Sequence, residues 1–245
     1  MLGLDGGTTF EFRVTSLNLD GEPTAPSPIV RCTPTQLTRY YVSGSTGNDT
    51  NPGTALRPFK TIQAAADWAG AIDPIHGGWL SVAAGTYTYP FYALPTGNLE
   101  RIRVSGGYTV GPFGTWTQTG APTSIQLTSF LPTGKNFVDG QESTAGLIVA
   151  ERRFAKFDNL QIVAQPSATE QRCSVALFAG NVVLQSVSIS TTGNVNARCR
   201  AAIHAHSDSG LGAVRIRGSS KITGFDMQAS TASIYQLRSI GIGGT

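Results

Sequence analysis

Short β-type segments of similar sequence recur along the second half of the chain at nearly constant spacing. Residues 158–162 (DNLQI) and 185–189 (QSVSI) lie 27 positions apart, and the segments that begin at Cys173 and Cys199 lie 26 apart. A coil of roughly 20–30 residues is typical of a β-solenoid. The repeat therefore predicts that these segments stack on one another, with room for about six coils from residue 80 onward.

The composition agrees with many short strands joined by tight turns. Charged residues make up only 13% of the chain, against about 25% in ordinary soluble domains. Ser and Thr together contribute 49 of the 245 residues, and there are 29 glycines. Because these residues disfavour helices, an all-helical fold is excluded. The 40% of hydrophobic residues suffices for a core, which excludes disorder for the bulk of the chain.

A single helix is predicted at residues 61–71, where four apolar side chains recur on one face and Thr61 is a suitable N-cap. The apolar residues of this face are Ile62, Ala65, Ala66 and Ala69. A short strand at residues 40–43 and a loop dense in turn formers precede the helix, and a strand at residues 79–84 follows it.

The same region carries an ordered series of motifs. They are Tyr-Val-Ser at 41–43, Gly-x-Asp at 47–49, Pro-Gly-Thr at 52–54, Pro-Phe-x-Thr-Ile-Gln-x-Ala at 58–65 and Val-x-x-Gly-Thr-Tyr at 82–87. This series resembles the N-terminal segment of secreted right-handed parallel β-helices, the pectin-lyase-like proteins. The resemblance implies an all-β fold over residues 35–245, a right-handed single-stranded parallel β-helix (solenoid) with a short N-terminal capping helix.

Residues 1–34 are expected to form a separate part of the chain. Alternating apolar and polar side chains, a turn signal and a second strand after two prolines predict a β-hairpin. The series GTTFEFRV at 7–14, DGE at 20–22 and SP at 27–28 resembles the last two strands of a fibronectin type III domain. The resemblance implies that residues 1–34 are the C-terminal remnant of such a domain, roughly a third of the sandwich.

The two ends of the chain carry no targeting or membrane segment. The start, MLGLDGG, lacks a basic region followed by an apolar run, and no stretch of about 18 apolar residues occurs. Residues 240–245 end inside the repeat without a cap. We therefore expect a fragment, truncated at the C-terminus, of an extracellular or cell-surface protein whose signal peptide is not in this chain. An open solenoid end would permit end-to-end or homo-oligomeric association.

A histidine-containing segment is the first candidate for chemistry. In a strand, His204 and His206 share one face while Ile203 points to the core, and Asp208 follows. Two histidines and a carboxylate at this spacing could bind a metal ion. A solvated polar face is the simpler explanation of the same residues.

A basic segment is the second candidate. Arg215 and Arg217 share an outward face, with Lys221 near, and stacking would join them to His204 and His206 in one polar surface. β-Helix polysaccharide lyases use an outward groove of this type, in which a basic residue abstracts the proton beside a uronate carboxylate. The resemblance makes His204, Arg215, Arg217 and Lys221 candidate catalytic residues, although a solvated basic face explains them more simply.

The loop at residues 48–51 (NDTN) is a candidate cation site. Its oxygen atoms, with Asp49 as the one carboxylate, could hold Ca²⁺. Asx turns explain the same residues without an ion. No other cofactor is indicated.

The cysteines show no zinc-ligand spacing. If the segments around Cys173 and Cys199 stack as neighbouring strands about 4.8 Å apart, their spacing permits a disulfide. Two buried thiols in adjacent strands are the alternative.

The sequence favours a structural or binding role over catalysis. A net charge of +3 without a basic run is not typical of a nucleic-acid-binding protein, and no phosphate-binding loop is present. Few titratable residues are available to build an active site. We expect a fragment of a secreted or surface protein with a structural, adhesive or carbohydrate-binding role, whose partner is a polysaccharide or cell-surface glycan. The alternative is a polysaccharide lyase or glycoside hydrolase that acts on an acidic polysaccharide.

Overall fold

The computed structural model describes residues 8–33, 37–89, 92–93, 99–136, 142–150, 152–165, 173–191, 201–205, 213–223 and 240–242. The chain divides into two compact units, Met1–Leu37 and Thr38–Thr245.

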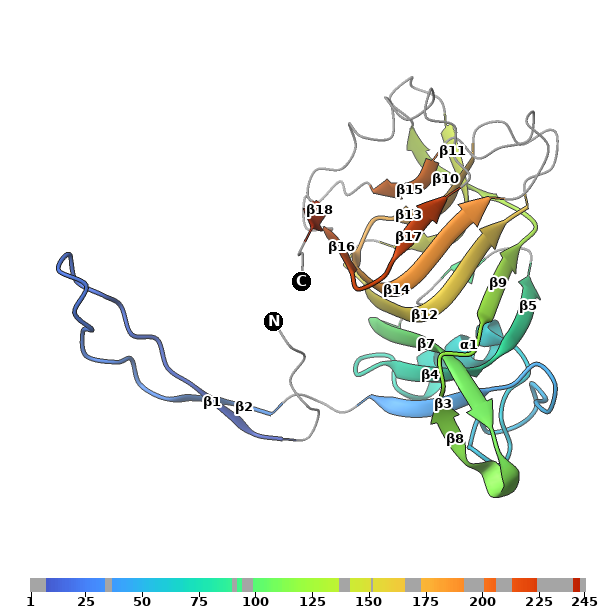
Figure 1. Ribbon diagram of the computed structural model, residues 1–245, viewed down its shortest axis with the longest axis horizontal. Coiled ribbons are helices and arrows are strands. Elements are labelled where there is room, and N and C mark those ends of the chain that lie inside the picture. The colour runs from blue at the N-terminus through green and yellow to red at the C-terminus, as the bar shows by residue number, and fades with distance from the viewer. Residues whose placement is uncertain are drawn as a thin grey trace. The chain divides into compact units, whose positions relative to one another are not determined.

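The first unit is an antiparallel hairpin (Figure 1). Strand β1 (Phe10–Phe12) pairs with β2 (Val30–Cys32). At the turn, Oδ1 of Asn18 accepts a hydrogen bond of 2.8 Å from the N–H of Glu22, and Gly21 has a φ of +83°. The predicted hairpin with its Asp-Gly turn is confirmed.

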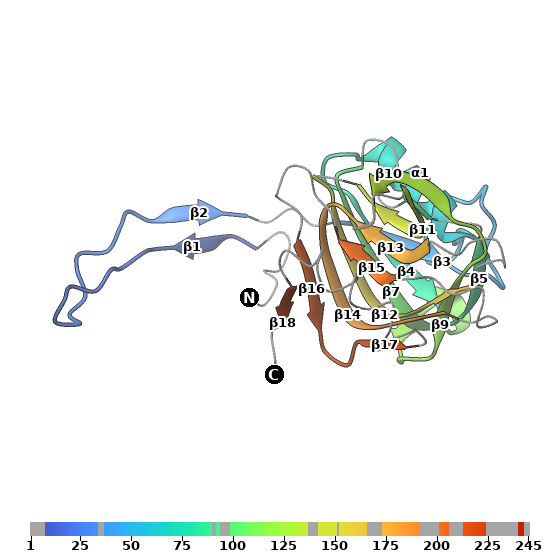
Figure 2. The ribbon, with the colours of Figure 1, turned by 90° about the horizontal axis from the view of Figure 1, so that it is seen from above.

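The second unit consists mainly of parallel strands in a curled sheet (Figures 1 and 2). In spatial order, its main path is β3 (Thr38–Val42), β4 (Gly78–Ala83), β7 (Arg101–Val110), β12 (Phe154–Ala164), β14 (Asn181–Thr191), β16 (Ala213–Arg217) and β18 (Ile240–Ile242). Beside this path lie β5 (Gly85–Tyr89), β9 (Thr123–Leu127) and β17 (Lys221–Thr223). Strand β8 (Trp116–Gln118) pairs antiparallel with β7 and follows the short 3₁₀ segment η1 (Pro112–Gly114).

A second sheet closes the core from another side. Its strands are β6 (Tyr92–Ala93), β10 (Leu131–Asn136), β11 (Glu142–Val149), β13 (Cys173–Phe178) and β15 (Ala201–Ala205). All its pairings are parallel except that of β10 with β11. Phe157 of β12 stacks on Phe178 of β13 with ring centroids 6.3 Å apart. The two sheets therefore share one apolar core.

The 27-residue repeat of the sequence is the register of the curled sheet. Strands β12 and β14 pair in parallel with Asp158 opposite Gln185 and Leu160 opposite Val187. The predicted stacking of these two segments is confirmed. Strands β13 and β15 also pair in parallel, with Ser174 opposite Ala201.

Strands β12 and β14 bend at equivalent positions. Asn159 has a φ of 52° and Ser186 a φ of 53°, the left-handed region. A single left-handed residue interrupts the strict alternation of side chains, so Phe157 before the bend and Leu160 after it both reach the core. Before the bend β12 pairs with β7, and after it β12 pairs with β9. The bend therefore curls the sheet while its apolar side stays inside.

The free edge of β3 is covered by the loop that leads into helix α1 (Ile62–Ile72). The N–H of Tyr41 donates to the carbonyl of Gly53, and the N–H of Phe59 donates to the carbonyl of Tyr41, each at 2.9 Å. Thr61 is the N-cap of α1, which packs against β3 and β4. The predicted helix and its cap are confirmed, within an all-β chain that has a curled parallel sheet.

Candidate functional site

The outer surface of the curled sheet carries two aligned rows of side chains. The first row is Arg39, Trp79, Arg103, Lys156, Val183 and Arg215, one residue from each of six neighbouring strands. The second row is Tyr41, Ser81, Ser105, Asp158, Gln185 and Arg217. The side chains between them, such as Leu80 and Phe157, are buried in the core. We call the two rows together with Phe154 the outer face.

Trp79 lies between two guanidinium groups. The Cζ of Arg39 is 4.6 Å from its ring centroid, and the Cζ of Arg103 is 4.2 Å from it. Neighbouring strands lie about 4.8 Å apart, so the register alone stacks these planar groups on one another. Guanidinium groups stack favourably on aromatic rings. Trp79 therefore holds both arginines in fixed orientations.

A buried carboxylate anchors the middle of the outer face. Asp158 is 3% exposed, and its Oδ2 accepts hydrogen bonds from Arg103 Nε at 2.9 Å and Ser105 Oγ at 3.0 Å. The indole N–H of Trp79 donates to Ser105 Oγ at 2.9 Å. Because a buried charge is stable only when it is paired and hydrogen-bonded, this network fixes the Arg103 side chain.

Lys156 stands beside this carboxylate. Its Nζ is 3.9 Å from Oδ2 of Asp158. Burial, followed by the charge of Arg103 and to a lesser degree that of Arg217, lowers the pKa of Lys156, and the charge of Asp158 opposes the shift. The amine is therefore easier to deprotonate than an ordinary lysine.

Aromatic side chains surround the other end of the first row. The Cζ of Arg39 lies 5.1 Å from the ring of Tyr41 and 5.2 Å from that of Tyr108. Its Nε donates to Ser81 Oγ at 2.8 Å. Trp116 packs against Tyr41 with ring centroids 4.9 Å apart. Arg39 is thus held by rings and a hydroxyl, while the rest of its guanidinium forms no hydrogen bond within the described residues.

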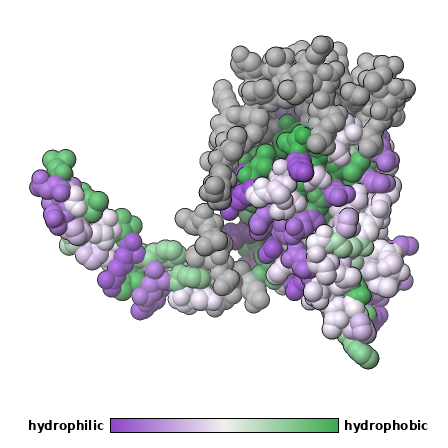
Figure 3. Space-filling view, viewed as in Figure 1, coloured by the Kyte–Doolittle hydropathy of each residue, from purple (hydrophilic) through white to green (hydrophobic). Residues whose placement is uncertain are grey.

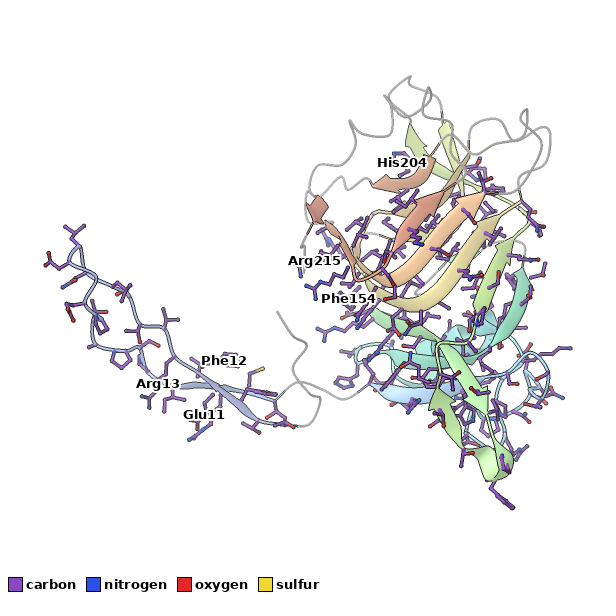
Figure 4. The ribbon with its side chains drawn as sticks, in the orientation of Figure 1. Glu11, Phe12, Arg13, Phe154, His204 and Arg215 are labelled. Atoms are coloured by element: carbon purple, nitrogen blue, oxygen red, sulfur yellow. The ribbon has the colours of Figure 1, made fainter. Side chains whose placement is uncertain are left out.

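Phe154 opens β12 on the same side of the sheet. It is 39% exposed and lies opposite Arg101 in β7 and Asn181 in β14. Figure 4 shows Phe154 and Arg215 projecting from the same side of the sheet. An exposed ring flanked by a guanidinium and an amide can stack on an apolar surface while its neighbours donate hydrogen bonds.

The structure separates some of the residues that the sequence singled out. Arg215 and Arg217 both lie on the outer face, as an exposed and a half-buried side chain. Lys221 pairs with Ser188, beyond the bend of β14, so it belongs to another part of the sheet. Its position removes it from the surface that Arg215 and Arg217 share.

His204 lies in the other sheet. It belongs to β15, which pairs with β13, so the polar surface expected to join it with Arg215 is not formed. Ile203 faces the core as predicted, but His204 is only 2% exposed. This burial corrects the expectation of a solvated side chain. His206 and Asp208 lie outside the described residues, and metal binding by this segment stays a prediction.

Asp49 connects the loop to the start of the helix. Its Oδ1 accepts hydrogen bonds from the N–H of Lys60 at 2.9 Å and of Thr61 at 2.8 Å, and its Oδ2 accepts from Thr61 Oγ1 at 3.1 Å. Across the described residues, no three His, Cys, Asp or Glu side chains gather as a metal site. Calcium binding at Asp49 stays a prediction.

The cysteine prediction cannot be placed on the structure. Cys199 lies outside the described residues, as does the side chain of Cys173. Cys32, in the hairpin unit, is an exposed free thiol.

The sequence did not single out the central residues of the outer face. Arg39, Trp79, Arg103, Lys156 and Asp158 come together only because their strands are in register. Each lies in a strand that alternates buried and outward side chains, which is the signal that could have found them. Unequal connections between β3, β4, β7 and β12 hide the alignment in the linear sequence.

Comparison with known proteins finds only distant structural likeness. No family model and no curated protein matches the sequence. The selenomethionine derivative of the GH136 lacto-N-biosidase from Eubacterium ramulus is similar over 74% of this chain and 31% of its own, with 16% identity and a TM-score of 0.44. The native form of that enzyme gives 15% identity and a TM-score of 0.39 over 76% of this chain and 30% of its own. The chain thus spans less than a third of that enzyme's length.

In the described part of the chain, no helix is long and apolar enough to cross a membrane.

Proposed function

We propose that this chain is part of an exported or cell-surface protein whose outer face binds an acidic polysaccharide without cleaving it. The observation that carries the proposal is the alignment of three half-buried cations, Arg39, Arg103 and Lys156, with the exposed Arg215 on the outer side of a single sheet. Only one carboxylate, that of Asp158, lies in the two rows, and it is buried and bonded to Arg103. The face therefore presents positive charge to solvent.

The chemistry of the arginines suits a carboxylated ligand. Arg39 and Arg103 each use only Nε for hydrogen bonds within the described residues, so their Nη groups remain for a ligand. A planar guanidinium binds a carboxylate through two parallel hydrogen bonds. Because Trp79 holds both groups in place, little side-chain entropy is lost when an anion binds.

The exposed ring of Phe154 adds a stacking surface. Sugar rings present C–H groups on one face and hydroxyls at their edges, so they suit an aromatic ring with polar neighbours. Arg101 and Asn181 lie opposite Phe154 in the adjacent strands. A glycan residue on Phe154 would therefore find hydrogen-bond donors on both sides.

The proposal includes a right-handed parallel β-helix for the second unit. Its support is the constant 27-residue register of β12 with β14 and of β13 with β15, together with the equivalent bends at Asn159 and Ser186. A coil that repeats in this way places the same outward positions one above another. That arrangement is what a long, repeating ligand requires.

A polysaccharide lyase is the second candidate, and Lys156 is the observation that favours it. An amine with a lowered pKa is unprotonated in a larger fraction of molecules at a given pH and so is more available as a general base, and Arg103 and Arg217 stand near it to neutralise a carboxylate. A glycoside hydrolase would need two facing carboxyl groups, whereas Asp158 is the one carboxylate in the two rows of the outer face.

Titration calorimetry of the full chain with polygalacturonate and with its methyl-esterified, neutral form tests the binding proposal. We expect binding to the acidic form alone, and a loss of affinity as salt is added because exposed charges are screened. Arg215→Gln should weaken binding about fivefold, the contribution of one exposed charge-assisted hydrogen bond. Arg13→Gln, which removes an exposed arginine from the hairpin unit, is the matched control and should have no effect. Equal binding of both polymers, or of neither, would contradict the proposal.

A further inference from the structure

The ribbon formed by β7 and β8 ends in an exposed aromatic side chain. Phe113, in η1, is 95% exposed, and its φ of 57° and ψ of 27° place it in the left-handed region. This backbone conformation costs a residue with a side chain stability that glycine does not lose. A large apolar residue in such a position contributes nothing to folding, so its presence calls for another explanation.

Other apolar side chains gather beside Phe113. Leu56 is 72% exposed and sits against Gly114, where an added Cβ would lie 2.6 Å from its Cδ2. Val110 and Pro112 are also exposed. We call Leu56, Val110, Pro112 and Phe113 the apolar tip. Figure 3 shows a hydrophobic surface at the lowest point of the second unit, where Figure 1 places this ribbon, next to residues of intermediate hydropathy.

Hydrogen bonds fix the conformation of the tip. The N–H of Gly111 donates to the carbonyl of Thr115 at 2.8 Å, and Thr115 Oγ1 donates to the carbonyl of Pro112 at 3.0 Å. The indole N–H of Trp116 donates to the carbonyl of Ala55 at 3.0 Å, which ties the ribbon to the loop that carries Leu56. The turn therefore satisfies much of its own backbone before it meets a partner.

The charges around the tip follow a simple pattern. Residues 104–134 contain no Asp, Glu, Lys, Arg or His. The adjoining loop carries the exposed cations Arg57, which directly follows Leu56, and Lys60, together with the carboxylate of Asp49, which accepts hydrogen bonds from the N–H groups of Lys60 and Thr61. An uncharged apolar apex with cations behind it suits a membrane surface, because the apolar side chains can enter the hydrocarbon while the cations contact the headgroups.

We propose that the apolar tip inserts into the surface of a lipid bilayer, with Arg57 and Lys60 against anionic headgroups. Hydrocarbon accepts a convex apolar side chain without matching its shape, but it requires backbone polar groups to be satisfied internally. A stable protein interface uses about 800 Å² per partner, which is far more than one narrow turn supplies.

Vesicle flotation of the full chain tests this proposal, with phosphatidylcholine vesicles that contain or lack phosphatidylglycerol. We expect the protein to float with the vesicles, and more of it when the anionic lipid is present. Phe113→Gly should reduce the floated fraction at least about fivefold, because most of the buried apolar area is lost. The same variant should raise the Tm, because glycine adopts the left-handed conformation without strain.

Two controls make the test specific. Leu19→Ser removes a fully exposed apolar side chain from the hairpin unit and should leave flotation unchanged. Phe113→Gly should also leave polygalacturonate binding unchanged, so failure of the membrane proposal and failure of the polysaccharide proposal are distinguishable. The membrane proposal is overturned if the chain does not float, if Phe113→Gly floats like the unmodified chain, or if Leu19→Ser abolishes flotation.

Discussion

At the scale of single residues, Asp158 and Lys156 differ in how deeply they are buried and in how well their charges are compensated. Asp158 is buried and accepts two hydrogen bonds, one from Arg103 and one from Ser105, so it stabilises the outer face from within. In the described part of the chain Lys156 forms one ion pair, with Asp158, and its ammonium is partly desolvated there. Asp158 therefore stabilises the fold, and under the proposed function Lys156 contributes its charge to ligand binding.

The lowered pKa of Lys156 has a consequence for stability. The unfolded chain, in which this lysine has its ordinary pKa, binds the proton more tightly than the folded chain. The charged form therefore costs stability below the lowered pKa, where the folded and the unfolded chain are both protonated. That cost is relieved as the pH rises from the lowered pKa to the ordinary one.

Lys156→Met should consequently raise the Tm by a few degrees at neutral pH, and the difference should shrink in strongly alkaline buffer. The same substitution should weaken polygalacturonate binding, because one cation of the outer face is lost. Lys60→Met, at an exposed lysine, is the control and should leave the Tm unchanged. Thermal unfolding followed by circular dichroism measures both variants, and a lower Tm for Lys156→Met would contradict the argument.

At the scale of elements, the left-handed residues at the bends of β12 and β14 allow the sheet to curl. Asn159 and Ser186 occupy equivalent positions with nearly equal φ values. Asn tolerates the left-handed conformation better than most residues, whereas Ser adopts it at greater cost. Each bend allows one strand to contribute to two walls of the same core.

Ser186→Gly should therefore stabilise the protein by about 1 kcal/mol, because glycine adopts the left-handed region without the Cβ penalty. Ser188→Gly, two residues along the same strand and paired with Lys221, should do the opposite and destabilise it by about 0.5–1 kcal/mol. Urea unfolding of the two variants measures the difference. Equal destabilisation by both would show that the bend at Ser186 is not strained.

At the scale of the whole molecule, regular features were predictable from the sequence and irregular ones were not. The pairing of Asp158 with Gln185 follows from a direct 27-residue echo, and Thr61 caps α1 through contacts within one turn. The stack of Arg39, Trp79 and Arg103 depends instead on connections of unequal length between their strands. No local sequence pattern predicts that alignment, so the outer face can be recognised only once the pairing of the strands is known.

The burial of His204 illustrates the same limit. Alternation along β15 correctly places Ile203 and His204 on opposite faces of the strand, but alternation alone does not tell whether the face of His204 is exposed to solvent. The membership of β15 in one sheet and β16 in the other also depends on distant pairings. The face to which a side chain points can be predicted from the local sequence, whereas the elements that pack against that face cannot.

The central claim is that the outer face binds an acidic polysaccharide and leaves it intact. The most direct measurement is to incubate the full chain with polygalacturonate under conditions where calorimetry detects binding, and to follow the ultraviolet absorbance of unsaturated products. We predict saturable binding that Arg215→Gln weakens, with no rise in absorbance. A rise in absorbance that disappears in Lys156→Met or Arg215→Gln would contradict the claim and identify the chain as part of a lyase.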